Sequence, residues 1–247
     1  MPRSRDLLWD GCRNIRDLGG LPTSDGRETR FGVVVRADNV TLLSEEGWQG
    51  LADYGVRRIV DLRHAEELDE DRPHKAGIDV VHTPTVADSS VFAEVDQLLA
   101  GITDPAAWRR ANYLEILQRA APNFGRAVTA VANGGNGAVL IHCAGGVDRT
   151  GLVSALLLRV AGVSIDTVAA DWAESERNWA PTIQPWIDGA PTEEERAKRK
   201  LLSVMPPGAM RDVLVELEAQ HRGTRKYLVG AGVAVAELDD IRKRMRS

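Results

Sequence analysis

The sequence predicts an α/β protein in which a central, mostly parallel sheet is flanked by helices. Apolar runs of strand length, rich in β-branched residues, occupy positions 31–36, 58–62, 78–83 and 138–141. Helical segments precede the second and the fourth of these runs, and such alternation is typical of parallel sheets. Charged or polar residues follow the strands, so functional groups are expected at the carboxyl edge of the sheet.

Local signals mark the helices of the N-terminal half. A helix begins after Ser44, a typical N-cap residue, and ends at Gly55. Asp104 and the proline that follows it start another helix, and a further one covers about 123–132. Residues 88–104 fit no clear pattern, so they are left unassigned.

The C-terminal part is predicted to be helical. A helix that is apolar nearly all round, closed by Gly162, is expected to lie in the core. Residues 164–247 follow as a helical part, with helices at 193–203, at 210–221 and within 224–246. This part is a candidate cover for the functional groups expected at the carboxyl edge of the sheet.

Residues 178–191 contain three prolines and the tryptophans Trp179 and Trp186. Such a segment is typical of a linker or of a mobile cover over a site. Ordinary packing between helices is an equally good interpretation, and the sequence leaves both open.

Composition limits the function classes. A chain of 247 residues can form one domain with a sizeable core, so residues 1–247 are treated as a single domain. The net charge of −5 argues against a broad nucleic-acid surface, and no apolar run is long enough to span a membrane. Residues 1–9 lack the apolar region of an export signal, so a cytoplasmic location is expected, with unconventional secretion as the alternative. The oligomeric state has no sequence signal.

Cys12 and Cys143 are too few cysteines for a disulfide framework, which favours a reducing compartment. A protective disulfide between the two and a plain buried Cys12 thiol are both open, and the plain thiol is the interpretation we favour.

The most informative stretch is a loop between the last apolar strand and the apolar helix. Its residues are His142, Cys143, Ala144, Gly145, Gly146, Val147, Asp148, Arg149 and Thr150. A loop of this length can turn successive backbone N–H groups inward, which suits a tetrahedral oxyanion. We therefore predict that residues 144–147, together with Arg149, bind phosphate.

The same loop places a nucleophile beside that anion site. Backbone N–H groups, a helix N-terminus and a cation all stabilise a thiolate, and Cys143 has all three nearby in the chain. Arg149 offers a planar fork that matches two phosphate oxygens. Thr150 is expected to support the thiolate by donating its hydroxyl to the Cys143 sulfur.

These residues resemble a known family. His142-Cys143-x5-Arg149-Thr150-Gly151 has the signature of cysteine-dependent phosphatases, and its form here resembles the atypical bacterial tyrosine phosphatases of the mycobacterial protein-tyrosine-phosphatase-B type. Residues 14–20, 60–63, 227–228 and 232–233 are also similar to motifs of that family. The resemblance implies a tyrosine-phosphatase-like fold and a phosphatase that acts on phosphotyrosine proteins or peptides, with no metal and no cofactor.

One position departs from the family pattern. The family usually has lysine before the loop aspartate, whereas this chain has Val147. Such a lysine could bind additional phosphates, so its absence weakens the case for phosphoinositide substrates. Phosphotyrosine is the expected substrate, with a phosphoinositide or dual-specificity phosphatase as the alternative.

The resemblance also implies a mechanism. Cys143 attacks phosphorus, a phosphocysteine forms, and water then releases phosphate. Asp148 is by resemblance the acid that protonates the leaving group, because the Trp-Pro-Asp tripeptide often used by conventional tyrosine phosphatases is absent. Asp61 is the alternative acid, although an aspartate at a strand end more often orients loops. His142 is expected to support the loop by hydrogen bonding.

A non-catalytic phosphate-binding module is the alternative from another class of protein. The joint presence of Cys143, Asp148, Arg149 and Thr150 favours an enzyme, because a binding module does not need a nucleophile.

Overall fold

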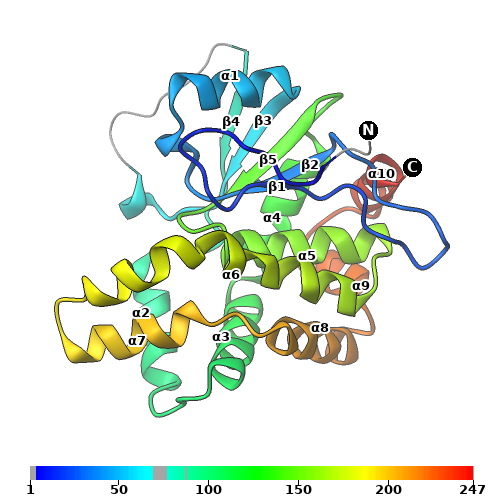
Figure 1. Ribbon diagram of the computed structural model, residues 1–247. Coiled ribbons are helices and arrows are strands. Elements are labelled where there is room, and N and C mark those ends of the chain that lie inside the picture. Colours follow the sequence, from blue (N-terminus) through cyan, green and yellow to red (C-terminus); the bar gives the residue numbers. More distant parts are fainter. Residues whose placement is uncertain (1–3, 69–76, 87, 247) are drawn as a thin grey trace.

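The computed structural model describes residues 4–68, 77–86 and 88–246 of the chain. Within these ranges the strands form one sheet in the order β1-β2-β5-β3-β4 (Figure 1). Their bounds are β1 Arg16–Asp17, β2 Val34–Ala37, β3 Val56–Asp61, β4 Asp79–His82 and β5 Ala138–His142. β1 is antiparallel to β2, whereas β2, β5, β3 and β4 run parallel. The predicted α/β class with a mostly parallel sheet is confirmed.

The helices cover both faces of the sheet. In the N-terminal part they are η1 Val40–Leu42, α1 Glu45–Asp53, η2 Ala65–Glu67, α2 Ser89–Leu98, α3 Pro105–Arg119 and α4 Ala121–Ala132. After β5 they are α5 Arg149–Ala161, α6 Ile165–Asp188, α7 Glu193–Ser203, α8 Pro207–His221, α9 Thr224–Gly230 and α10 Val235–Met245. Figure 1 shows α1 on one face of the sheet and α4 and α5 on the other, with α6, α3 and α8 beyond them.

The alternation of side chains along the central strand explains this layering. Leu140 packs in a cluster with Trp48 and Leu51 of α1. Val139 and Ile141 belong to a second, larger cluster that includes α4 and α5. Because successive side chains of a strand point to opposite faces, a strand that is apolar throughout requires cover on both sides. β5 is buried along its whole length, as a central parallel strand should be.

The helix caps predicted at Ser44 and Asp104 are present, and two of the C-terminal helices have caps of the same kind. The side chains of Ser44, Asp104, Ser164 and Thr192 each accept a hydrogen bond from a backbone N–H in the first turn of the following helix. Gly162 ends α5 with a φ of 92°, a conformation that favours glycine. The unassigned stretch contains α2, whose cap is Asp88.

Residues 178–188 are not a linker. They form the second half of α6, which continues through Pro181 and Pro185 to Asp188. A proline inside a helix leaves the carbonyl four residues earlier without its usual donor. Both prolines lie on the exposed side of α6, where water can reach those carbonyls, so the helix tolerates them.

The C-terminal helices pack on α5 and on one another. α6 and α8 lie along each other, α8 also contacts α3, and α10 contacts α5. None of the helices in the described part of the chain is both long and apolar enough to cross a membrane.

Candidate active site

The candidate site lies where β5 ends and α5 begins. Cys143 is buried directly after the strand, and the loop to Arg149 curves over the edge of the sheet. Gly146 has a φ of 65°, and a Cβ there would lie 2.6 Å from the carbonyl oxygen of Ala37. Only glycine fits this position, so the loop is held against β2.

Four successive carbonyl groups of the loop accept hydrogen bonds from outside it. The pairs are Asn39 N to Ala144 O (3.0 Å), Trp179 Nε1 to Gly145 O (2.9 Å), Arg36 Nη2 to Gly146 O (2.7 Å) and Trp172 Nε1 to Val147 O (3.2 Å). Asn14 Nδ2 also donates to Gly145 O, at 3.1 Å. The carbonyls are therefore held on the outer side of the loop.

The backbone N–H groups of the loop are left for a ligand. Within the described residues, none of the N–H groups of residues 144–148 donates to another protein group. The first turn of α5 adds further free N–H groups and the positive end of the helix dipole. Free N–H groups in such a loop form a cradle that suits a phosphate-sized anion, so phosphate binding by residues 144–147 stays a prediction that this geometry allows.

Arg149 is held beside the cradle by Glu67 of η2. Its Nη2 lies 2.7 Å from Glu67 Oε1, and Nη1 contacts the other carboxylate oxygen. Burial alone would raise the pKa of Glu67, but the hydrogen bond from Arg149 brings that pKa below its ordinary value. The guanidinium also lies 5.6 Å from the centre of the Phe92 ring. Glu67 was not anticipated from the sequence, where the only signal is an acidic pair following the second-strand motif.

Asp61 and His142 lie behind the loop. Arg63 Nη2 donates to Asp61 Oδ2 at 2.8 Å, and both side chains are buried. His142 Nε2 is 3.7 Å from Asp61 Oδ1, and its Nδ1 is 3.3 Å from the carbonyl of Cys143. Burial lowers the pKa of His142 to about 4, so the ring is neutral near pH 7. This geometry fits an orienting role for both residues.

Asp148 directly precedes Arg149 in the loop and lines a cavity. Its Oδ1 accepts hydrogen bonds from Tyr113 Oη at 2.6 Å and from Arg109 Nη1 at 2.8 Å. The Asp148 side chain is 47% exposed, whereas that of Arg109 is 1% exposed. Sequence reasoning missed Arg109 and Tyr113. The only sign of this pair in the sequence is the spacing: an arginine four positions before a tyrosine lies on the same face of a helix as that tyrosine.

Thr150 does not make the predicted contact. Its hydroxyl is buried and has no hydrogen-bond partner in the described part of the chain, so donation to the Cys143 sulfur is absent. The side-chain rotamer of a threonine in a helix is limited by the preceding turn, and the sequence pattern does not reveal which way it points.

Both cysteines are free thiols. Cys12 is partly buried, and its sulfur lies 3.8 Å from the carbonyl oxygen of Asn39. Burial and the nearby Asp38 carboxylate raise the pKa of Cys12, which keeps this thiol protonated and unreactive.

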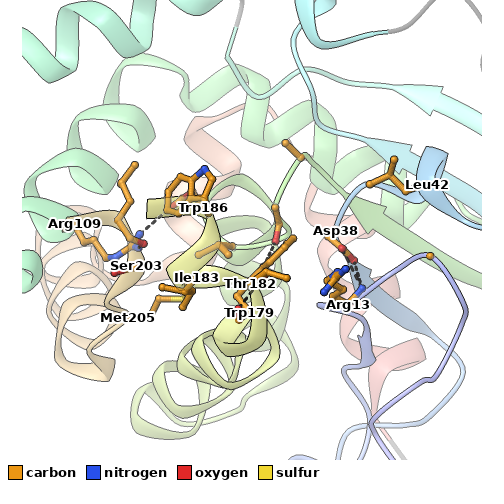
Figure 2. Close-up of a pocket in the computed structure, with 16 residues that line it drawn as sticks. Arg13, Asp38, Leu42, Arg109, Trp179, Thr182, Ile183, Trp186, Ser203 and Met205 are labelled. Atoms are coloured by element: carbon orange, nitrogen blue, oxygen red, sulfur yellow. Dashed lines mark hydrogen bonds and ion pairs between the residues drawn. The ribbon is translucent and has the colours of Figure 1, made fainter. Parts of the chain in front are cut away.

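A cavity of about 640 Å³ opens above the loop. Figure 2 shows Arg13, Asp38 and Leu42 on one wall and Ser203 and Met205 on the other. Between them lie side chains of the second half of α6, namely Trp179, Thr182, Ile183 and Trp186. The segment at 178–188 is therefore a wall of the candidate site.

A buried ion cluster supports the loop from below. Asp171 of α6 pairs with Arg16 and Arg36, at 3.1 Å and 2.9 Å, and also with Arg5. Burial would raise the pKa of Asp171, but Arg16 and Arg36 hold it well below its ordinary value. Arg36 also binds the Gly146 carbonyl, so the cluster ties α6 and β2 to the loop.

Comparisons with known proteins agree with this site. The model of the tyrosine phosphatase family matches residues 7–247. A Cupriavidus necator protein assigned as a tyrosine-protein phosphatase is 31% identical over 231 residues, which cover 92% of this chain and 80% of that protein. A tyrosine-protein phosphatase of Nostoc commune is 25% identical over 233 residues, with 85% of this chain and 73% of the relative covered. The triple specificity protein phosphatase PtpB of Mycobacterium tuberculosis is 28% identical over 191 residues, or 67% of each chain. The chain therefore belongs to the tyrosine phosphatase family.

Proposed function

We propose that this phosphatase hydrolyses phosphotyrosine by way of a phosphocysteine on Cys143. The observation that carries the proposal is the arrangement of the loop: the carbonyls of residues 144–147 accept hydrogen bonds from outside it, whereas its N–H groups are left for a ligand beside the buried Cys143 thiol. Such a cradle binds the three non-bridging oxygens of a phosphate and leaves phosphorus above the sulfur.

In the first step the Cys143 thiolate attacks phosphorus in line with the bond to the phenolic oxygen. The S–P bond forms as the P–O bond breaks, and Asp148 transfers its proton to the leaving phenolate. Arg149 and the loop N–H groups stabilise the negative charge on the equatorial oxygens.

In the second step water attacks the phosphocysteine. Asp148, now a carboxylate, accepts a proton from that water, the P–S bond breaks, and the Cys143 thiolate returns as phosphate leaves. His142 and Asp61 hold the loop from behind, and we assign them no proton transfer because both are buried and the Asp61 carboxylate is engaged by Arg63.

The cavity favours an aryl phosphate over a polyphosphorylated lipid headgroup. Its middle section is apolar and aromatic, with Trp179, Ile183 and Trp186. Val147 takes the place of a lysine in the loop, and the Arg109 guanidinium in the cavity wall is committed to Asp148. Among the described residues of the cavity wall this leaves Arg13 to face a second phosphate of a phosphoinositide, whereas the first phosphate has Arg149 and the loop N–H groups. We therefore propose that phosphotyrosine, in a protein or peptide, is the substrate.

We further propose that residues 1–247 act as one phosphatase domain, in which the helical part 164–247 covers the site. The support is the shared core, because one hydrophobic cluster includes Leu18 near the start, Val153 of α5 and Met245 near the end. A reducing compartment such as the cytoplasm suits an enzyme that depends on a free thiol.

The test is substitution of the nucleophile. Cys143→Ser should reduce hydrolysis of p-nitrophenyl phosphate to below about one thousandth of the wild-type rate while binding of inorganic phosphate persists. Cys12→Ser is the matched control and should stay active. Wild-type protein that binds phosphate without turnover would contradict the enzyme and favour the non-catalytic binding module.

The substrate class needs its own comparison. We expect kcat/KM for a phosphotyrosine peptide to exceed that for the matched phosphoserine peptide and for a phosphatidylinositol monophosphate in vesicles. Equal or higher activity on the lipid would contradict phosphotyrosine as the substrate.

A further inference from the structure

Asp148 is held by one of its two carboxylate oxygens. Oδ1 accepts from both Tyr113 and Arg109, at 2.6 Å and 2.8 Å. Within the described residues, no group donates to Oδ2. The two oxygens therefore differ: Oδ1 is fully engaged, and Oδ2 is free on a half-exposed side chain that lines the cavity.

The two donors are themselves fixed. Arg109 Nε donates to Val204 O at 2.9 Å, and Nη2 donates to Leu202 O, so carbonyls at the C-terminal end of α7 orient the guanidinium. The ring of Trp172 lies 5.4 Å from the guanidinium carbon of Arg109, and the same tryptophan donates to the Val147 carbonyl. Tyr113 lies edge-on to Trp172. Trp172 therefore contacts both donors to Asp148 and also fixes the loop through the Val147 carbonyl.

Tyr113 is suited to donate at every working pH. It is fully buried, and burial raises the pKa of its phenol well above the ordinary value. The phenol therefore keeps its proton and points it at Asp148 Oδ1.

We propose that Arg109 and Tyr113 are a positioning pair for Asp148, holding Oδ1 so that the proton for the leaving group is carried by Oδ2. A proton on Oδ1 would meet the hydrogens of both donors, so Oδ2 is the oxygen left to carry it. As the P–O bond breaks, this proton passes to the phenolic oxygen, and the carboxylate that remains is already hydrogen-bonded at Oδ1. The pair stabilises the product of proton transfer, which lowers the barrier for leaving groups that need a proton. This inference rests on the proposed role of Asp148 as the acid.

The experiment compares Tyr113→Phe with Tyr227→Phe. Tyr227 is a matched control because its hydroxyl is also buried and also bonds α3, at the Leu117 carbonyl, away from the site. Tyr113→Phe should lower kcat about tenfold on phenyl phosphate, whose leaving group is poor, and less than about threefold on p-nitrophenyl phosphate. Tyr227→Phe should leave the ratio of the two rates unchanged. Equal losses on both substrates, or no loss, would overturn the positioning pair.

Two further variants separate this inference from the proposed function. Asp148→Asn should show a larger leaving-group effect, and adding Tyr113→Phe to it should cause no further loss on phenyl phosphate. If Asp148→Asn shows no leaving-group effect, the acid role itself fails. If Asp148→Asn shows a leaving-group effect and Tyr113→Phe does not, only the positioning pair fails.

A third variant tests the arginine of the pair. Arg109→Lys keeps the charge but loses the planar fork, and should reproduce the effect of Tyr113→Phe in protein that melts cooperatively.

Discussion

Two arginine–carboxylate pairs involve adjacent residues of the phosphate loop, and the loop contributes the carboxylate to one pair and the arginine to the other. In the first pair the arginine, Arg149, faces the anion site and the carboxylate of Glu67 holds it. In the second pair the carboxylate of Asp148 faces the cavity, and the arginine, Arg109, is buried and holds it. The same kind of ionic contact therefore positions a cation in one pair and a carboxylate in the other.

An arginine–carboxylate ion pair therefore does not by itself reveal which of its two partners acts on the substrate. That assignment comes from surroundings: Arg149 adjoins the free N–H groups of the loop, and Asp148 opens into the cavity. Away from the loop N–H groups, Asp171 joins Arg16 and Arg36 in a cluster buried on all sides, which serves the fold. Substitutions in each of these groups should have different readouts.

The largest effect is expected at the arginine that faces phosphate. Arg149→Lys keeps the charge but loses the planar fork, so kcat/KM on p-nitrophenyl phosphate should fall about 100-fold or more. Steady-state kinetics measure this loss, with Arg119→Lys in an exposed pair with Glu115 as the control. A loss below about threefold would show that a point charge is sufficient and that the fork has no role.

Asp171→Asn should damage stability. It leaves two buried guanidinium groups without their carboxylate, and breaking a buried pair of this kind costs about 3–5 kcal/mol. Because the pKa of Asp171 is lowered in the fold, its contribution is present above the unfolded value near pH 4 and is lost as pH falls further. Urea unfolding at pH 7 and at a series of pH values below about 4 measures both effects. A variant as stable as wild type would contradict the role of this cluster.

Glu67→Gln should have the smallest effect. The amide still accepts one hydrogen bond from Arg149 but loses the charge, so kcat/KM should fall by about tenfold or less. Glu66→Gln, on the neighbouring exposed residue, is the control. An increase in activity would reverse the interpretation, because it would mean that Glu67 competes with phosphate for the fork instead of orienting it.

The sequence was sufficient for the fold class and for the centre of the site. Residues 138–141 are a continuous apolar run and appear as β5, because a strand buried on both faces is apolar throughout. Residues 58–62 have a shorter apolar centre, Ile59 and Val60, and overlap β3. The loop motif from His142 to Gly151 is local, so its residues reach one place whatever the rest of the chain does. β1 escaped prediction because two residues are too few to show a period.

The sequence alone was enough to predict the position of the phosphate loop, the alternation of strands and helices, and the helix caps at Ser44 and Asp104. All of these depend on neighbours within a few residues. The tertiary structure was needed to show which side chains bind the residues of that loop. Glu67, Arg109 and Tyr113 reach it from separate elements, and α6 continues through two prolines to form a wall of the cavity. The Thr150 hydroxyl likewise turned out to lack the sulfur contact. Contacts between distant segments depend on how whole layers pack, and no local pattern in the chain encodes that packing.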